Sequence, residues 1–304
     1  MIWRVERRPG NPMTPIAILT PAADDPAYKS HWPVVLERLS TALAMADVTA
    51  VPTAWTDHVE DASGLIGYPL VLGVLTWGYY ERHKDWLAAT TLWGEAGVPI
   101  ANPASVLGWN SDKAYLRRLE AAGIAIPPTA WSDQVTQAEV EVAFDRFGTD
   151  TLVVKPTVSG GAWKTVKISR GEALVDAPDG AAMIQPFLPE LVADGELSLL
   201  FFGGRFSHAV IKTARAGDFR VQIQYGGDYT HVADPPAGAV ALAERVLAAI
   251  EEPLLYARVD MVESGSKCVL MEAELVEPDF YLSQAPDGGR LFAEAVRDRL
   301  ASVA

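Results

Sequence analysis

The spacing of apolar residues alternates between a strand period and a helical period along the first third of the chain. Short apolar runs at residues 15–19, 48–51 and 70–75 predict buried strands. Segments 32–46 and 81–97 place apolar residues near every third or fourth position, which predicts amphipathic helices. Strands that alternate with helices in this order indicate an α/β unit with a largely parallel sheet.

Three aromatic residues, Trp77, Tyr79 and Tyr80, follow the predicted strand at 70–75. Ligands of parallel sheets bind near the ends of the strands. We therefore consider all three, Trp77 and Tyr79 first, as candidates for the wall of a substrate site. Packing in an apolar core is the more common use of such side chains, and the sequence leaves this alternative open.

The remainder of the chain contains more strands. The pattern predicts them at 152–154, 166–168, 182–188, 197–202 and 206–212, with helices at 135–147, 236–250 and 288–303. Residues 256–282 then give two further alternating strands around a polar loop at 263–267, which predicts a β-hairpin.

This hairpin carries the most informative acidic residues. If Val262 pairs with Cys268 across the loop, Asp260, Glu272 and Glu274 share one face, whereas a slip of one residue would scatter them. Three neighbouring carboxylates repel one another unless a cation compensates. Oxygen-only ligands favour a hard ion, Mg²⁺ or Mn²⁺. A solvated outer face of an edge hairpin is the alternative.

Two lysines mark a candidate anion site. Lys113 is predicted in the first turn of a helix at 109–123, where the helix dipole disfavours a cation unless an anion shares the site. Lys155 begins a loop between two strands that contains Ser159, Gly160 and Gly161. P-loop and Rossmann fingerprints are absent, so we interpret this loop as a flap whose backbone N–H groups could cradle phosphate. A hairpin turn that needs glycine for its backbone conformation is the alternative.

Composition excludes several classes of protein. The 304 residues are 49% hydrophobic and 21% charged, which is typical of a soluble protein of two or three compact units. The net charge of −14 argues against a general nucleic-acid or membrane-surface binder, because both need a basic face. The single cysteine excludes an internal disulfide and suits the cytoplasm, and no apolar run has transmembrane length. Residues 1–12 lack the apolar core of a signal peptide, and Met13 is an alternative start.

These motifs, in this order, resemble the ATP-grasp superfamily in its glutathione-synthetase-like branch. The motifs that carry the resemblance are Lys113, Lys155 before the glycine loop, Gln185-Pro186-Phe187-Leu188, and Asp260 with Glu272 and Glu274. Segments 195–198, 206–210 and 218–222, together with Glu277-Pro278, are similar to the subgroup that includes the ligase closing O-ureidoserine to cycloserine. Ser198 stands where glutathione synthetase has an arginine, so the substrate of that enzyme is not implied.

The resemblance implies an α/β fold, with α+β character in the C-terminal part, in which two antiparallel sheets clamp ATP. We expect an N-terminal α/β domain at 13–108, a central lid subdomain at 109–184 and a C-terminal catalytic subdomain at 185–304. The N-terminal domain, which in the family shapes the acceptor pocket, matches least.

The resemblance also implies which residues bind ATP. The phosphates would meet the two lysines and the glycine loop, the adenine would meet main-chain groups of a linker, and an acidic residue would accept from the ribose. These residues are Lys113, Lys155, Ser159, Gly160, Gly161, Gln185, Pro186, Phe187, Leu188 and Glu196.

Further residues are implied for the chemistry itself. Asp260, Glu272 and Glu274 would hold two Mg²⁺ or Mn²⁺ ions that bridge the phosphates. Lys212 and Arg220 would stabilise the transferring phosphoryl group.

The implied reaction joins a small-molecule carboxylate to an amine. The carboxylate takes the γ-phosphoryl group of ATP, and the amine captures the acyl phosphate, which gives an amide, ADP and phosphate. The residues do not separate an intramolecular cyclo-ligase from a two-substrate ligase, and they leave open a homodimer or higher homo-oligomer. A small-molecule kinase and a nucleotide-binding module without turnover are alternatives, and the intact set of lysines and carboxylates argues against the second.

Overall fold

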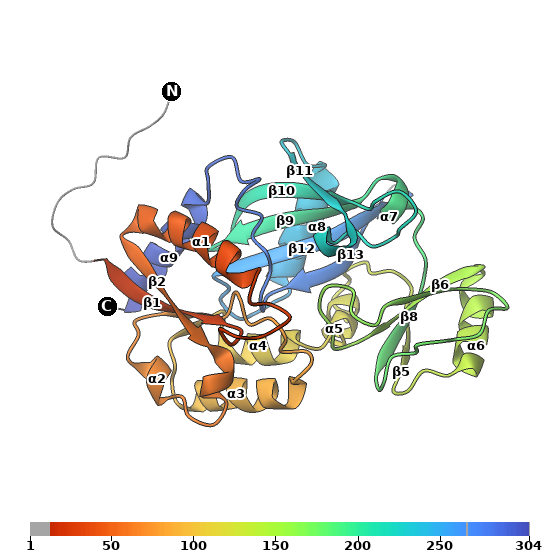
Figure 1. Ribbon diagram of the computed structural model, residues 1–304. Coiled ribbons are helices and arrows are strands. Elements are labelled where there is room, and N and C mark those ends of the chain that lie inside the picture. Colours follow the sequence, from red (N-terminus) through yellow and green to blue (C-terminus); the bar gives the residue numbers. More distant parts are fainter. Residues whose placement is uncertain (1–12, 266, 304) are drawn as a thin grey trace.

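The computed structural model describes residues 13–265 and 267–303. The N-terminal segment 1–12 and one residue of the predicted hairpin loop lie outside these ranges. The described strands form three sheets, one parallel and two antiparallel (Figure 1). The predicted α/β class, with α+β character in the later part, is confirmed. No helix within the described ranges is long and apolar enough to cross a membrane.

The N-terminal sheet is parallel, with the strand order β2-β1-β3-β4. Its strands and helices are β1 (Thr14–Thr20), α1 (Trp32–Leu43), β2 (Val48–Ala54), α2 (Ser63–Ile66), β3 (Val71–Leu72), α3 (His83–Glu95), β4 (Ile100–Ala101) and α4 (Ala104–Asn110). α1 has proline in its first turn and buries Val35, Leu39 and Leu43, which recur every four residues along one face. β3 is shorter than the predicted strand at 70–75.

The second sheet is antiparallel, with the order β5-β8-β6-β7. Its strands are β5 (Ala130–Ser132), β6 (Thr151–Pro156), β7 (Val166–Ser169) and β8 (Ala182–Pro186). α6 (Gln137–Phe147) packs Val140 and Phe144 against this sheet. The helix begins with a capping box between Thr136 and Glu139, which satisfies backbone N–H groups at its start.

The third sheet is antiparallel, with the order β11-β10-β9-β12-β13. Its strands are β9 (Glu196–Phe202), β10 (Arg205–Thr213), β11 (Asp228–Val232), β12 (Tyr256–Ser264) and β13 (Lys267–Glu274), and the remaining helices are α5 (Tyr115–Ala121), α7 (Glu190–Ala193), α8 (Ala237–Ala248) and α9 (Arg290–Val303). We propose one domain around each sheet, with the limits 13–108, 109–184 and 185–304, of which the last begins within β8.

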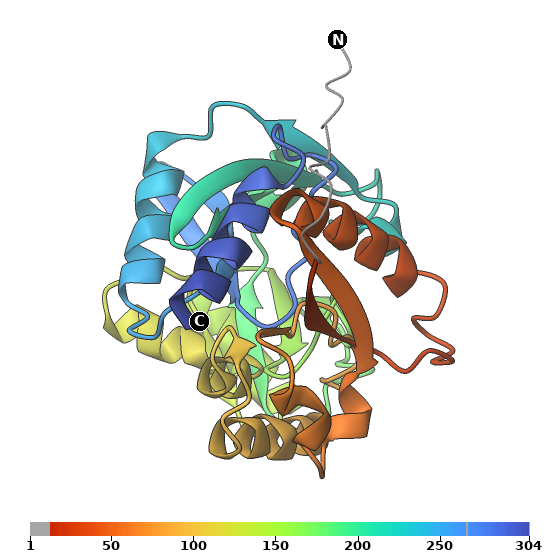
Figure 2. The same ribbon diagram turned by 90° about the vertical axis from the view of Figure 1, so that its left-hand side faces the viewer.

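The first and third sheets share a hydrophobic core. α9, at the end of the chain, lies beside α1 (Figure 2). Ile18 of β1, Phe202 of β9 and Phe292 of α9 belong to one buried cluster. The buried Asn102 side chain also joins the two units, because its Nδ2 donates to the carbonyl oxygens of Tyr256 and Leu275 at 2.9 Å each. This packing fixes the N-terminal unit against the hairpin β12–β13.

The predicted helix at 109–123 is wrong in its first turn. α4 ends at Asn110, and α5 begins only at Tyr115, so Lys113 lies in the turn between the two helices. The side chain of Asn110 donates to Ala273 O and accepts from Leu275 N, at 2.9 Å each, which ties it to the end of β13. Asp112 Oδ1 accepts from the backbone N–H of Ala114 at 2.8 Å. These side-chain bonds to backbone groups compete with a continuous helix.

Candidate active site

The register of the hairpin β12–β13 differs from the predicted one. Next to the loop, Glu263 pairs with Cys268 and Val262 pairs with Val269, so the expected pairing of Val262 with Cys268 is wrong by one residue. If this register continued along the strands, Asp260 would share its face with Met271. The acidic residues of β13 would then point to the opposite face.

A β-bulge restores the predicted face. The register shifts by one residue between Asp260 and Met261, and Asp260 is therefore directly opposite Glu272. Arg258, two residues before Asp260, is opposite Glu274. The three predicted metal ligands thus share one face of the sheet, but an arginine shares it with them.

Each of the three carboxylates contacts a cation. Glu272 Oε1 lies 2.9 Å from Lys113 Nζ. Asp260 Oδ2 lies 2.9 Å from Nζ of the buried Lys212 on β10. Arg258 is ion-paired with Glu274, and its Nη2 lies 3.0 Å from Asp260 Oδ2. The face is therefore a compact array of opposite charges.

Because these groups are buried, their charges strongly shift one another's pKa. Burial would by itself raise the pKa of Asp260, but the Arg258 guanidinium and the Lys212 ammonium hold that pKa well below its usual range. Burial and the charges of Glu272 and Asp260, opposed by Arg258, together raise the pKa of Glu274 to about 7. Burial disfavours the ionised form of this carboxylate, so a further cation at the site would stabilise it.

The donor atoms fit a hard divalent ion, although the side chains are not gathered around one position. Among residues 13–265 and 267–303, no three Asp, Glu, His or Cys side chains form a ready metal site. Asp260, Glu272 and Glu274 offer only carboxylate oxygens, and two of them are cross-strand partners. Binding of Mg²⁺ would require Glu272 and Glu274 to turn away from Lys113 and Arg258.

The predicted phosphate-binding lysines lie at the same face. Lys113 Nζ, besides its ion pair, donates to Ser159 O at 2.8 Å. Lys155 is half-buried on β6, and burial lowers its pKa, while the charge of Glu272 acts in the opposite direction. Its ammonium forms no hydrogen bond or ion pair with any residue in the described ranges, which leaves it available to an anion.

The predicted flap, residues 157–164, packs against the N-terminal unit through Tyr80. A Cβ atom on Gly160 would lie only 2.7 Å from Tyr80 Cε1, so glycine allows this close approach. The rings of Tyr80 and Trp163 are 5.6 Å apart. The Tyr80 hydroxyl lies 2.8 Å from the hydroxyl of Tyr28, which holds the tyrosine in place. Gly161, next in the flap, has a positive φ of 55°.

We expect Gly160→Ala to displace the flap and to raise the KM for ATP by about tenfold, because 2.7 Å is too short for a carbon–carbon contact. Steady-state kinetics and limited proteolysis of the flap measure the two effects. In a Tyr80→Ala background the added methyl group has space, so Gly160→Ala should then have little further effect. A full tenfold effect in both backgrounds would show that Tyr80 is not what requires glycine.

The predicted adenine linker follows β8. Gln185 is buried, and its Nε2 donates to Thr129 Oγ1 at 2.8 Å, so its side chain stabilises the strand. Pro186 ends β8, and the Phe187 N–H donates to Thr151 O at 3.0 Å. The Leu188 N–H has no acceptor among the described residues, as a ligand-binding donor would require.

Glu196 and Arg220, the other residues of the nucleotide prediction, lie in different surroundings. Glu196 Oε2 is 2.7 Å from Lys212 Nζ, so Lys212 joins it to Asp260. Arg220 binds Asp218 through both its Nε and Nη2, at 3.0 and 2.8 Å, and lies over the ring of Tyr225. It is not brought into contact with the carboxylates of the hairpin.

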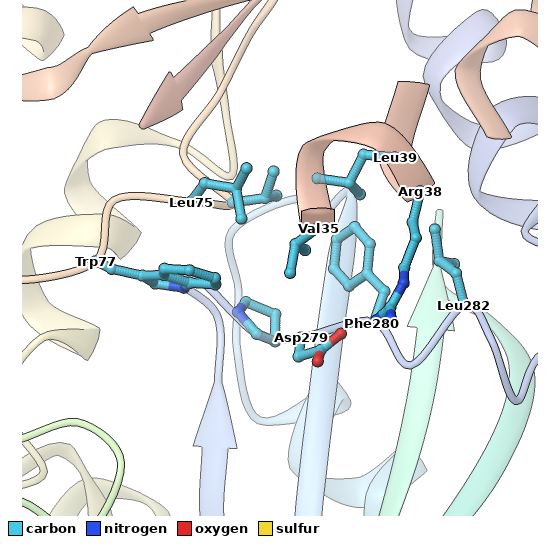
Figure 3. Close-up of a pocket in the computed structure, with 10 residues that line it drawn as sticks. Val35, Arg38, Leu39, Leu75, Trp77, Asp279, Phe280 and Leu282 are labelled. Carbon is cyan, nitrogen blue, oxygen red and sulfur yellow. The ribbon is translucent and has the colours of Figure 1, made fainter. Parts of the chain in front are cut away.

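The predicted substrate wall lies where the N-terminal unit meets the chain after β13. Tyr79 is buried, with its ring centroid 5.2 Å from that of Trp86. Trp77 stacks on His31 and lines a small pocket with Val35 of α1 and Phe280 (Figure 3). The space open to water there is about 10 Å³, room for one water molecule at most.

The sequence did not predict the surroundings of three residues of this region, although Tyr80 was a candidate for the substrate wall. Arg258 is two residues before Asp260 on one strand, a spacing that puts both on the same face, so the pattern contained this signal. Tyr80 meets the flap from a distant part of the chain, and no local pattern reports such a contact. Glu277 was noted only as part of a motif with Pro278, and it lies close enough to Glu274 for the charge of Glu274 to raise the pKa of Glu277.

Comparison with known proteins identifies the family. No family model matches the chain. The chain is 30% identical over 306 residues to the cycloserine biosynthesis protein DcsG of Streptomyces lavendulae, covering 94% of this chain and 98% of that protein. The chain belongs to the ATP-grasp ligases. The resemblance read from the motifs is thereby confirmed, as is the prediction of an enzyme that forms amide bonds.

Solved structures of ATP-grasp ligases have the same fold. The crystal structure of D-cycloserine synthetase DcsG superposes with a TM-score of 0.77 at 26% identity, covering 94% of this chain and 99% of that one. D-alanine–D-alanine ligase from Bacillus anthracis in complex with ATP gives 0.67 at 17% identity, covering 95% and 98%. The ATP-grasp ligase PsnB in complex with a precursor variant, Mg and ADP gives 0.62 at 13% identity, covering 95% and 100%.

Proposed function

We propose that this ATP-grasp ligase uses ATP and Mg²⁺ to activate the carboxylate of an amino acid or a small peptide-like molecule. An amine then captures the acyl phosphate, and ADP and phosphate are released. The observation that carries the proposal is the convergence of Lys113, Lys155, Lys212 and Arg258 on the carboxylate face of the hairpin β12–β13, beneath the flap 157–164.

The cations would act on the phosphates. Lys155, which has no partner among the described residues, and Lys113 would bind the β- and γ-phosphates, and the backbone of Ser159, Gly160 and Gly161 would cover them. Lys212 and Arg258 would stabilise the negative charge that spreads over the transferring phosphoryl group. Arg220 would join them only if its loop moved, because it is paired with Asp218.

The base and ribose of the nucleotide would bind at the linker after β8 and at Glu196. Pro186 O and the Leu188 N–H would bind the adenine, with Gln185 and Phe187 holding the linker in position. Glu196 would accept hydrogen bonds from the ribose hydroxyls. Its pKa is raised by burial, against the effect of Lys212, which is consistent with a carboxylate that gains a hydrogen-bonding ligand.

Asp260, Glu272 and Glu274 would hold the metal, which we propose to be two Mg²⁺ ions. When bound, these ions neutralise phosphate charge and orient the γ-phosphate. The chain's own contribution is to position the carboxylate and phosphate and to exclude water, since water would hydrolyse the acyl phosphate. The contact of the flap with Tyr80, made by Gly160 and Trp163, supports this role.

For the substrate, we propose an amino acid whose own nitrogen closes a ring, as the name of the cycloserine relative suggests. The acceptor and the carboxylate would then belong to one molecule, for which O-ureido-D-serine is the first candidate to test. Trp77 and Tyr79 would form part of the wall of this site, at the junction of the N-terminal unit and the hairpin.

The reaction class can be tested by trapping the acyl phosphate. Enzyme, Mg-ATP and amino-acid or dipeptide pools are screened for phosphate release, and hydroxylamine is then added. A ligase gives a hydroxamate together with ADP and phosphate. A stable phosphorylated product without free phosphate would instead identify a small-molecule kinase, and no ATP turnover with any pool would contradict the proposal.

We expect Lys155→Ala to weaken ATP binding by about 1.5–3 kcal/mol, or about 10- to 150-fold in Kd, because a charged hydrogen bond to phosphate is lost. Calorimetric titration with AMPPNP and Mg²⁺ measures the change. Lys84→Ala, which removes an exposed lysine of α3, is the matched control and should bind like the parent. Equal affinity of the Lys155 variant and the control would refute the role of Lys155.

A further inference from the structure

The charges at the active site are paired, with two exceptions. Its carboxylates are Glu196, Asp260, Glu272, Glu274 and Glu277, and its cations are Lys113, Lys155, Lys212 and Arg258. Ion pairs engage all of these groups except Lys155 and Glu277, which have no hydrogen bond or ion pair with the described residues. Lys155 has an evident ligand in the phosphates, whereas nothing in the proposed function uses Glu277.

Glu277 lies where the chain leaves the hairpin and crosses the N-terminal unit. Val276, just before it, is buried in the cluster that contains Tyr79. Pro278, just after it, lines the small pocket with Trp77. The charge of Glu277 raises the pKa of both Tyr79 and Tyr80, so the carboxylate is near these rings as well as near Glu274. It therefore lies between the carboxylate face and the aromatic wall.

The carboxylate of Glu277 is recessed but reachable. Its side chain retains partial exposure, and its oxygens are not among the fully buried atoms that lack a partner. Burial nevertheless raises its pKa well above the usual value, with a further contribution from Glu274. A side chain that is partly buried and still open to solvent can be reached by a charged group of a ligand.

We propose that Glu277 binds the ammonium group of the substrate, and that the substrate is therefore an amino acid with a free α-amino group. This role rests on the proposed function, which places the substrate carboxylate at the phosphates. The ammonium of the same substrate would then lie at the predicted wall formed by Trp77 and Tyr79. An unpaired carboxylate near Tyr79 and Tyr80 combines an opposite charge with aromatic neighbours, the two features that bind an organic ammonium. Glu277 is then a specificity-determining residue that acts on the substrate and not on ATP.

An ammonium fits this position better than a metal ion does. Glu277 has no carboxylate partner across the hairpin, because it lies beyond the end of β13. The aromatic rings on its other side offer no carboxylate ligands to Mg²⁺, which needs about six oxygen ligands in near-ideal octahedral geometry. A substrate ammonium needs only one carboxylate and an apolar, aromatic surround.

The test compares matched substrates that differ only in the α-amino group. The pairs are O-ureido-D-serine with 3-(ureidooxy)propionic acid, and D-alanine with propionic acid, each assayed for hydroxamate formation with Mg-ATP and hydroxylamine. We expect the parent enzyme to prefer the amino acid by about 10- to 100-fold in kcat/KM. In Glu277→Gln this preference should fall to within about threefold, while the KM for ATP stays unchanged.

Glu263→Gln, at the exposed loop end of the same hairpin, is the control and should keep the full preference. An unchanged preference in Glu277→Gln, or a loss confined to ATP binding, would overturn the role of Glu277. Calorimetry also measures the binding of the same substrate pairs to the enzyme with Mg-ADP, because binding does not need turnover. If no hydroxamate forms at all, the proposed function fails. A binding preference for the amino acid that Glu277→Gln abolishes would still support the ammonium site. If the parent enzyme shows no such binding preference, the ammonium site is overturned.

Discussion

Replacing Glu272 by glutamine is expected to lower kcat by about 10³-fold, with little change in stability. The substitution keeps the shape of the side chain but removes a charge that we assign to the metal, and losing one electrostatic group of this kind costs about 10²–10³ in rate. Lys113, its present partner, keeps its hydrogen bond to Ser159 O, so the ammonium is not left without an acceptor. Steady-state phosphate release and thermal unfolding measure the two effects.

The control for this variant is again Glu263→Gln, which makes the same chemical change on the same hairpin away from the charged face. It should retain full activity. Activity of Glu272→Gln within about threefold of the parent would contradict the metal assignment. A large loss of stability in that variant would instead assign Glu272 a structural role through its ion pair with Lys113.

Replacing Arg258 by methionine is expected to lower the free energy of unfolding by about 3–5 kcal/mol, the usual cost of removing one partner from a buried ion pair. Arg258 is only 6% exposed, and it neutralises Asp260 and Glu274 together. Its loss leaves Lys212 as the one cation among the described residues that still contacts Asp260. Methionine fills a similar volume, so the effect reports the charge and not a cavity. Chemical denaturation followed by circular dichroism measures it.

The exposed Arg297 of α9 gives the matched control, because its ion pair with Asp298 is on the surface. Arg297→Met should change the free energy of unfolding by less than about 1 kcal/mol. Equal stabilities of the two variants would show that the array of charges on the hairpin face does not contribute to folding. Partial recovery of Arg258→Met by Mg²⁺ would be expected, because a bound cation compensates the same carboxylates.

The element types of the fold follow from local patterns, and these predictions are largely confirmed. The helical spacing of Val35, Leu39 and Leu43 and the apolar run of β1 each reflect burial of one face, which the residues themselves encode. The break between α4 and α5 was not predicted, because it depends on bonds from Asn110 to β13, far along the chain. A local pattern contains no information on such a partner.

The acidic face of the hairpin was predicted correctly although the register was wrong. Alternation along β13 puts Glu272 and Glu274 on one face whatever the pairing, but their relation to Asp260 depends on the register. The bulge at Asp260 and Met261 corrects a one-residue slip next to the loop, and nothing in the alternation of either strand signals it. The same alternation places Arg258 on this face, and its pairing with Asp260 and Glu274 then follows from charge.

A crystal structure of the enzyme with AMPPNP and Mg²⁺ is the most direct test that the carboxylate face of the hairpin binds the metal and the triphosphate. We predict metal ions about 2.0–2.1 Å from carboxylate oxygens of Asp260, Glu272 and Glu274, with the ion pairs to Lys113 and Arg258 opened and the triphosphate against Lys155. Nucleotide bound elsewhere, or triphosphate at this face with all three carboxylates still paired to their cations, would contradict it.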